Sequence, residues 1–419
     1  MIKRKKILVF TDCYIYGGSE RLMSFLLSNN TLKENYEMKL AYRKFAAYEE
    51  GMRNDYIGTP TSDLLPQVLL SNESFFFRIN CMTMPKIMKV IVKLPFFVFQ
   101  KLQIYAIFNL IVFSILLRKQ KPEILHINNG GYPGAKSCNV LVLANYLTIK
   151  AKVVYQVNNQ AQSQKNYFEK VLDRIINKKV DFFVNASQRA KDQLVQKRNF
   201  DPSKILLVNN CVPLPKEKQT REEILKELNI PLNSFLIVEV AFLSERKGQK
   251  YLIDALADLY EREQIAKNKV YCAFVGNGED EEFLKKYIDE LGLKSNIFLL
   301  GYRNNSEDFI SACDLFVLPS IRDEDMPLVL LSALGYGQTI IATDFAGIAQ
   351  VIQNNSNGIL IENDLKTFTT NLSKEVLRLL NNKDLRVKLG MNAQKSYMDF
   401  SPENYGLKLL NIYKQVYAK

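Results

Sequence analysis

Short runs of β-branched, aromatic and other apolar residues alternate along the chain with longer stretches that carry apolar residues at helical spacing. The apolar runs are continuous, which is typical of parallel strands covered by helices on both faces. In the first half we predict strands at residues 6–11, 38–42, 123–128, 152–157, 180–185 and 204–208. In the second half we predict them at residues 235–241, 270–275, 297–300, 314–318, 339–342 and 358–361. Two such series predict two doubly wound α/β domains.

The chain has 419 residues, which is too many for one ordinary hydrophobic core. Residues 209–220 are rich in proline and lysine and show no periodicity, as expected of a linker between domains. We therefore predict an N-terminal Rossmann-like domain over residues 1–210 and a C-terminal one over residues 219–400. Residues 401–419 are expected to form a closing helix that can pack on either domain.

Composition narrows the choice of partner and excludes one kind of metal site. The formal net charge of +12 indicates an anionic partner: nucleic acid, an acidic membrane surface or a phosphorylated substrate. The six cysteines form no CxxC pair and there is one histidine, so a Cys/His metal site is excluded and no metal is expected. Reduced thiols indicate a cytoplasmic protein, and the short apolar run after the basic N-terminus is interpreted as a strand, not as a signal peptide.

Three glycine-containing loops follow predicted strands at positions where this kind of fold binds ligands. Gly17 and Gly18 precede a helix, so backbone N–H groups can approach an anion there, although a plain tight turn is the alternative. Arg246 and Lys247 lie in the sequence AFLSERKG, and Lys247 is suited to hold a diphosphate, although most lysines are simply solvated. Gly276 and Asn277 lie in FVGNGEDEEF at the next strand end.

An acidic loop runs into an apolar helix in the sequence PSIRDEDMPLVLLSALG. Pro327 suits the first helical position, and glycines at 335 and 337 predict where the helix ends. We expect the N–H groups of Met326, Leu328 and Val329 to receive a diphosphate, and Glu324 to accept hydrogen bonds from sugar hydroxyls. The alternative is that one of the acids merely caps the helix.

Together these motifs resemble the donor-binding signature of retaining nucleotide-sugar glycosyltransferases of family 4, glycosyl transferases group 1. The resemblance implies the GT-B fold, in which two doubly wound Rossmann-like domains face each other across a cleft that holds the active site. It also implies that Gly17 and Gly18 face the donor diphosphate.

Three positions depart from the family pattern. The family has two glutamates eight residues apart, of which the first meets the donor sugar or its phosphate and the second the ribose; here they are Glu324 and Ser332. The arginine that the family places five positions before the lysine is Phe242, and Arg246 is a candidate substitute. The later stretch TDFAGIAQVI is similar to the family's TDxGGIxEVI, with Gln350 in place of the glutamate. Replacing a charged hydrogen-bond partner with a neutral one costs about 1 kcal/mol of binding free energy. Ser332 alone therefore does not predict an inactive protein.

The single histidine lies near the end of a predicted strand, in the sequence EILHINNGGYPG. Family members often have HxH here, and this chain has His126 and Asn128, with Asn128 at the position nearer the donor sugar. The resemblance makes both residues catalytic candidates beside Glu324 and Lys247. The alternative is that His126 is an ordinary core histidine.

Residues 74–122 contain no acidic residue but eight lysines or arginines. Lys86, Lys89 and Lys93 fall on one face of a predicted helix that ends at Pro95, with apolar residues on the other face. With Lys101 they predict contact with an anionic membrane surface. Residues 106–117 are expected to be a crossover helix buried on the sheet, and the apolar run is too short to predict a spanning helix.

We therefore expect an enzyme that moves a sugar from a nucleotide-diphosphate sugar, without cofactor or metal, to a lipid-linked or cell-envelope polysaccharide acceptor such as lipopolysaccharide. It is expected to lie in the cytoplasm at the inner face of the cell membrane. Two alternatives remain: a nucleotide-sugar epimerase of the same fold, and a catalytically silent sugar-nucleotide-binding subunit. Nucleic-acid binding is not expected, because the basic residues lie among apolar ones.

Overall fold

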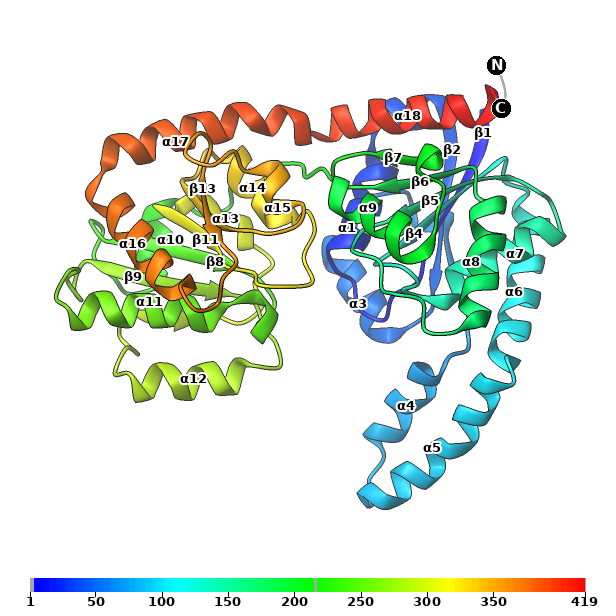
Figure 1. Cartoon of the computed structure of the whole chain (residues 1–419), viewed down its shortest axis with the longest axis horizontal. Helices are drawn as coiled ribbons and strands as arrows, with labels where there is room; N and C mark the ends of the chain where they lie inside the picture. Colours follow the sequence, from blue (N-terminus) through cyan, green and yellow to red (C-terminus); the bar gives the residue numbers. More distant parts are fainter. Residues whose placement is uncertain (1–3, 215–216, 419) are drawn as a thin grey trace. The chain divides into compact units, whose positions relative to one another are not determined.

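The computed structural model describes residues 4–214 and 217–418, which form two compact units (Figure 1). The first unit consists of residues 1–185, 191–208 and 406–419, and the second of residues 186–190 and 209–405. The closing helix α18 (Pro402–Ala418) thus belongs mostly to the first unit.

The first unit is built on a seven-stranded parallel sheet with strand order β3-β2-β1-β4-β5-β6-β7. Its strands are β1 (Lys5–Thr11), β2 (Tyr36–Arg43), β3 (Leu64–Gln67), β4 (Ile124–Asn129), β5 (Lys152–Val157), β6 (Phe182–Asn185) and β7 (Ile205–Leu207). The helices that begin before residue 200 are α1 (Gly18–Ser28), α2 (Asn30–Asn35), α3 (Ala46–Asp55), α4 (Asn72–Cys81), α5 (Lys86–Lys101), α6 (Ile104–Gln120), α7 (Lys136–Leu147), α8 (Tyr167–Lys179) and α9 (Gln188–Arg198). Strands β1, β4 and β5 are almost entirely buried, which explains their continuous apolar sequence.

The second unit is built on a six-stranded parallel sheet with strand order β10-β9-β8-β11-β12-β13. Its strands are β8 (Phe235–Val240), β9 (Val270–Val275), β10 (Ile297–Leu299), β11 (Leu315–Leu318), β12 (Ile340–Asp344) and β13 (Ile359–Glu362). Its helices are α10 (Arg221–Glu227), α11 (Gln249–Glu261), α12 (Glu281–Glu290), α13 (Ser306–Ala312), α14 (Leu328–Gly335), α15 (Ile348–Val351), α16 (Phe368–Asn381) and α17 (Lys383–Ser396). The prediction of two doubly wound Rossmann-like domains is confirmed.

Every predicted strand is present, and one strand was missed. The missed strand, β3, is a four-residue edge strand that is only partly buried and contains Pro66. A short edge strand with a proline lacks the apolar run by which a buried strand is recognised.

The prediction that the basic helix ends at Pro95 is wrong, because α5 continues to Lys101 with Pro95 inside it. Beyond the proline, Phe96 stacks on Phe75 of α4 with ring centroids 4.5 Å apart. This packing between helices outweighs the local cost of a proline within the helix.

Helix α6 is buried on one side only. Phe113, Leu116 and Leu117 are buried, and Phe113 packs edge-to-face on Phe10 of β1. Its opposite side, including Ile107 and Ile111, is exposed, so the prediction of a buried crossover helix holds for one face. In the described residues no single helix is long and apolar enough to cross a membrane, while α5 and α6 pass that test only as a pair bent by 62°.

Candidate functional site

The candidate donor site lies at the carboxyl edge of the sheet in the second unit. Since all strands of this sheet are parallel, β8, β9, β11 and β12 end at the same edge. Their following loops carry Lys247, Asn277, Glu324 and the residues before α15. Open α/β sheets bind ligands at this edge.

Lys247 and Glu324 meet at this edge although they are far apart in the chain. Lys247 lies in a short 3₁₀ turn after β8, and its Nζ forms an ion pair with Glu324 Oε2. Their side chains are 10% and 13% exposed, so the pair is largely shielded from water but still reaches the surface. Ser320 Oγ also donates to Glu324 Oε2, at 3.4 Å. The two residues that the sequence singled out for phosphate and sugar thus form one charged centre.

Arg246 supplies a second positive charge to this centre. Its Nη1 donates to the carbonyl oxygen of Asp323 at 3.2 Å and lies 4.0 Å from Glu324 Oε2. Phe242, at the position of the family's arginine, is half exposed and carries no charge. Phe242 cannot supply a positive charge beside Lys247, and Arg246 is the residue that does.

Close backbone contacts hold the loops in place. A side chain at Gly248, which has a φ of +81°, would approach the carbonyl oxygen of Pro319 to 2.0 Å. One at Gly276 would approach the carbonyl oxygen of Ala241 to 1.9 Å, and Leu243 N donates to Asn277 O at 2.9 Å. Gly276 and the Asn277 backbone thus fix the loop that carries Lys247, whereas the Asn277 side chain is exposed.

The start of α14 lies directly after the acidic loop. The helix begins at Leu328, with Pro327 as its extended cap residue, so Pro327 precedes the first helical position instead of filling it. The cap residue Pro327 has no side-chain hydrogen bond to this end of the helix. N–H groups in a first helical turn, here those of Leu328 and Val329, have no intrahelical acceptor.

Two further predicted positions at α14 are poorly placed for a ligand. Ser332 is 2% exposed and Met326 is 4% exposed. The Met326 carbonyl oxygen accepts a hydrogen bond from Asn210 at 2.8 Å, which fixes the chain just before the helix. Ser332 would need movement of its surroundings before it touched a ribose.

Sequence reasoning missed two buried acids near this edge. Asp325 is 2% exposed, and burial raises its pKa to about 7, with the charge of Glu324 adding to the rise. Glu239 in β8 is 1% exposed; burial raises its pKa well above the usual range, and its Oε1 accepts from Gln249 at 2.9 Å. Only burial distinguishes these acids, and the sequence carries no signal for it.

In the first unit, the glycine loop and Asn128 lie together at the carboxyl edge of the sheet. Gly17 is the cap residue of α1, and its N–H donates to Glu20 Oε2 at 3.2 Å. Asn128 Nδ2 donates to Thr11 Oγ1 at 3.1 Å and to the Ser19 carbonyl oxygen at 3.3 Å. Burial raises the pKa of the Glu20 carboxyl. Asn128 therefore fixes the glycine loop through its own hydrogen bonds.

His126 lies in the core of the first unit and is fully buried. Its Nδ1 is 2.8 Å from the hydroxyl of Tyr413 in α18, and its Nε2 is 3.2 Å from Gln156 Oε1. Burial lowers its pKa to about 4. A neutral imidazole enclosed in this way favours the alternative interpretation, in which His126 is a core residue, and its bond to Tyr413 attaches α18.

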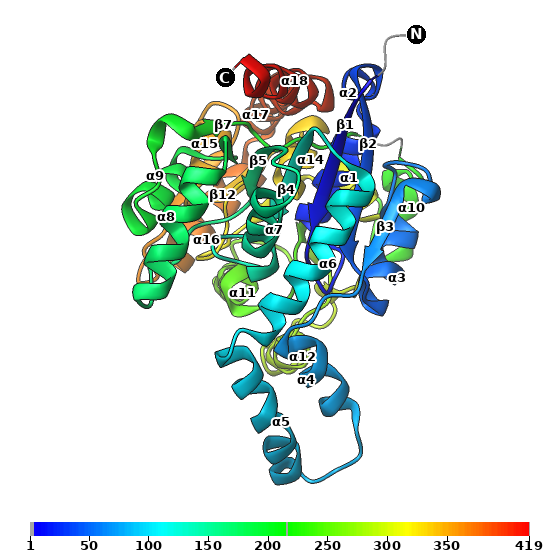
Figure 2. The same ribbon diagram turned by 90° about the vertical axis from the view of Figure 1, so that its right-hand side faces the viewer.

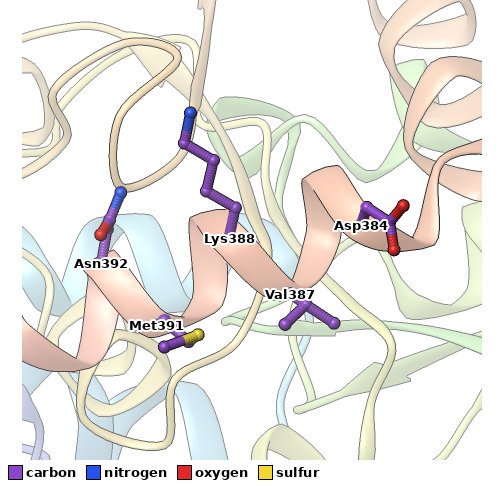
Figure 3. Close-up of a pocket in the computed structure, with 5 residues that line it drawn as sticks. All are labelled: Asp384, Val387, Lys388, Met391 and Asn392. Carbon is purple, nitrogen blue, oxygen red and sulfur yellow. The ribbon is translucent and has the colours of Figure 1, made fainter.

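Other parts of the described chain offer no competing site. No group of three or more His, Cys, Asp or Glu residues in residues 4–214 and 217–418 has the arrangement of a metal site. A hollow lies against α17, lined by Asp384, Val387, Lys388, Met391 and Asn392. Figure 3 shows Lys388 and Asn392 pointing to one side of this helix and Val387 and Met391 to the other. All five residues come from one helix, far in sequence from the loops with the charged residues.

The two units and their carboxyl-edge loops define a protein of the GT-B class. Residues 220–396 match the profile of the family described as "Glycosyl transferases group 1". This match covers most of the second unit and supports the family resemblance drawn from the sequence motifs.

Known proteins of this class resemble the chain to different extents. It is 32% identical over 216 residues to the Escherichia coli UDP-Gal:α-D-GlcNAc-diphosphoundecaprenol α-1,3-galactosyltransferase, covering 49% of this chain and 55% of that protein. It is 22% identical over 431 residues to an uncharacterized glycosyltransferase of Methanocaldococcus jannaschii, covering 100% and 99%. The crystal structure of Anabaena HepE in complex with UDP superposes with a TM-score of 0.74 at 15% identity, covering 98% and 100%. The structural match shows the fold alone, and the E. coli alignment spans about half of each chain.

Proposed function

We propose that the protein is a retaining glycosyltransferase that moves a sugar from a nucleotide-diphosphate sugar to a lipid-linked or cell-envelope polysaccharide acceptor. The observation that supports this most is the Lys247–Glu324 pair beside the first turn of α14. It combines a cation for the diphosphate, a carboxylate for sugar hydroxyls and backbone N–H groups for phosphate oxygens.

The chemistry needs stabilisation of a leaving diphosphate. The bond between the anomeric carbon and the β-phosphate oxygen breaks, and its electron pair leaves with the nucleotide diphosphate. Lys247 and Arg246 offset the developing negative charge, while the N–H groups of Leu328 and Val329 donate hydrogen bonds to phosphate oxygens. The acceptor hydroxyl forms the new glycosidic bond and releases its proton. We propose that these groups perform the role that a metal ion has in other transferases.

The ion pair has a role before the donor binds. With no phosphate present, Glu324 neutralises Lys247 in a shielded position. When the diphosphate arrives, Lys247 exchanges the carboxylate for phosphate oxygens, and Glu324 becomes available to the sugar hydroxyls. One binding step therefore orients both the leaving group and the sugar.

We further propose a lipid-linked acceptor and a place at the inner face of the cell membrane. The E. coli relative uses UDP-Gal and a diphosphoundecaprenol-linked acceptor, so these are the first substrates to test. Lys86 and Lys101 are exposed at the two ends of α5, and Lys89 and Lys93 lie on the same helix. Of these four lysines, Lys86 and Lys101 are the proposed contacts with anionic lipid.

The first experiment screens nucleotide sugars by the shift in melting temperature that each causes in the full chain. The stabilising donor is then incubated with and without an undecaprenyl-diphosphate sugar, and nucleotide release and the anomeric configuration of the product are measured. We expect release only with acceptor, retained configuration, and loss of turnover in Glu324→Ala and Lys247→Ala. The Lys294→Ala variant, which removes an exposed ion pair with Asp289, is the matched control.

The remaining outcomes separate the alternatives. Conversion of the donor sugar without acceptor would identify an epimerase. Donor binding without turnover over a broad acceptor panel would identify a silent binding subunit. Unchanged turnover in both site variants would contradict the assignment of Lys247 and Glu324.

A further inference from the structure

Helices α4, α5 and α6 project from the first unit (Figure 1, Figure 2). Many apolar residues of α5 and α6 are exposed. None of the residues of α5 is buried. The exposed apolar residues of α5 and α6, here called the apolar face, are Ile87, Met88, Val90, Ile91, Leu94, Phe97, Val98, Phe99, Ile104, Ile107, Phe108, Ile111 and Ile115. Their exposed fractions run from 38% at Phe108 to 75% at Ile87. Exposed apolar surface of this extent on a folded protein marks an interaction site.

A helix that is held to a membrane surface by its lysines directs them outward. In α5, Lys89 and Lys93 instead face α4. Lys89 Nζ donates to the Asn80 carbonyl oxygen and Lys93 Nζ to Asn80 Oδ1, each at 2.7 Å. Lys93 also lies 5.2 Å from the centre of the Phe76 ring. Two of the lysines therefore serve to attach α5 to α4, and the side of α5 that faces away is apolar.

The three helices are held together by specific contacts. Phe75 of α4 stacks on Phe96 of α5 at 4.5 Å and on Tyr105 of α6 at 5.9 Å. The amide of Asn109 in α6 donates to the Leu70 carbonyl oxygen at 3.0 Å and accepts from Leu70 N at 2.9 Å. The apolar face is thus presented by an ordered, packed element.

Charge identifies the occupant of this face. Residues 74–122 carry eight lysines or arginines and no acid. Lys86 and Lys101 are exposed at the ends of α5, while Arg118 and Lys119 are exposed in the last turn of α6. An apolar surface on helices that carry cations and no acid is complementary to an anionic bilayer, which offers acyl chains beside phosphate groups. Neither helix spans a bilayer alone, because α5, with 16 residues, is only about 24 Å long.

We propose that α5 and α6 insert the apolar face into one leaflet of an anionic bilayer as a wedge that does not span it. Lys86 and Lys101 would then lie at the phosphate level, while Lys89 and Lys93 keep α4 attached. The end of β3 leads into α4, so the wedge lies beyond the carboxyl edge that carries Gly17 and Asn128. The bilayer contact is therefore on the same end of the first unit as the glycine loop and Asn128. This inference specifies the membrane contact of the proposed function but does not depend on sugar transfer.

The chain contains no tryptophan, so a single introduced one reports on its own surroundings. We would compare Ile91→Trp in the apolar face with Val387→Trp on α17. The native side chains Ile91 and Val387 are 52% and 53% exposed. The full-length variants are mixed with phosphatidylglycerol-containing vesicles and with phosphatidylcholine vesicles. We expect a blue shift and quenching by acyl-chain spin labels for Ile91→Trp with anionic vesicles only. An unshifted spectrum in a protein that sediments with the vesicles would contradict insertion.

Vesicle sedimentation tests the same idea without a probe. The Ile87→Glu/Ile91→Glu/Leu94→Glu variant changes only exposed residues and is expected to lose about tenfold or more in partitioning. Lys86→Ala/Lys101→Ala is expected to lose about fivefold for each lysine at low salt, and Val387→Glu/Met391→Glu nothing. Equal binding by the triple variant, no binding by the native chain, or a dimer that the triple variant abolishes would each overturn the proposal. Turnover of the triple variant with a short-chain, water-soluble acceptor measures the proposed function separately, and we expect it to be unchanged.

Discussion

The carboxyl edges of the two sheets have the same topology but different chemistry. In the second unit the loops bring together Lys247, Arg246 and Glu324, and the charges reach the surface. In the first unit the corresponding loops are held by amides and hydroxyls, with Asn128 bonded to Thr11 and to the glycine loop. A charged, accessible edge suits a diphosphate, whereas the charged pair at the first unit's edge, Arg43 with Asp12, is buried. We propose that the same fold divides donor and acceptor binding between the two units by side-chain choice.

The largest effect is expected where the charged edge is broken. Lys247→Ala and Glu324→Ala should each lower kcat about 10² to 10³-fold, since each removes a group aimed at charge or hydroxyls of the reacting donor. Steady-state kinetics with the identified donor and acceptor measure this loss. Lys294→Ala should match the native protein, and Lys247→Arg should recover part of the activity. A native kcat in both alanine variants would mean that the charged edge is not the reacting centre.

In the first unit, by contrast, a change at the histidine should affect stability and not catalysis. His126→Ala leaves Tyr413 and Gln156 without their partner in the core and should cost about 3 kcal/mol of unfolding free energy. Chemical denaturation measures this cost, while kcat per folded molecule stays at the native value. Tyr413→Phe should cost about 1 kcal/mol. A fall in kcat with unchanged stability would restore His126 as a catalytic candidate.

The raised pKa of Asp325 predicts that the stability of the second unit depends on pH. Because burial raises its pKa to about 7, the folded state holds a proton that the unfolded state has already released above pH 4. Its contribution is complete below about pH 4 and is lost as the pH rises toward about 7, at about 1.4 kcal/mol for each pH unit. Asp325→Asn should remove this fall when unfolding free energies are measured from pH 4 to pH 8. An unchanged slope would contradict the assignment, and the exposed Asp289→Asn is the control.

The smallest effect should come from adding charge to the edge that already has it. Phe242 is half exposed, so Phe242→Arg can reach the solvent-facing side of the loop and supply the cation of the family pattern. We expect about fivefold tighter binding of the nucleotide diphosphate, or about 1 kcal/mol, by calorimetry. Phe283→Arg on α12 has a similar exposure and should leave binding unchanged. No gain at Phe242 would show that Arg246 already fills this role.

The order of elements was predictable because buried parallel strands leave a strong apolar signal. All twelve predicted strands exist, and β3 escaped because it is short, half exposed and contains Pro66. The encounter of Lys247 with Glu324 followed from their places after β8 and β11 of one parallel sheet. The buried carboxyls of Asp325 and Glu239 left no such signal, because an acid has the same sequence pattern on a surface and in a core.

The sequence by itself determined two α/β units, the loops that carry the donor motifs, and a basic segment without acids. Only the tertiary structure decided which way that segment faces: Lys89 and Lys93 turn toward Asn80 of α4, and the apolar side of α5 faces outward. It also enclosed His126 between Gln156 and Tyr413. The physical reason is that periodicity shows that a helix or strand has two faces, whereas the neighbours that pack against it decide which face is buried.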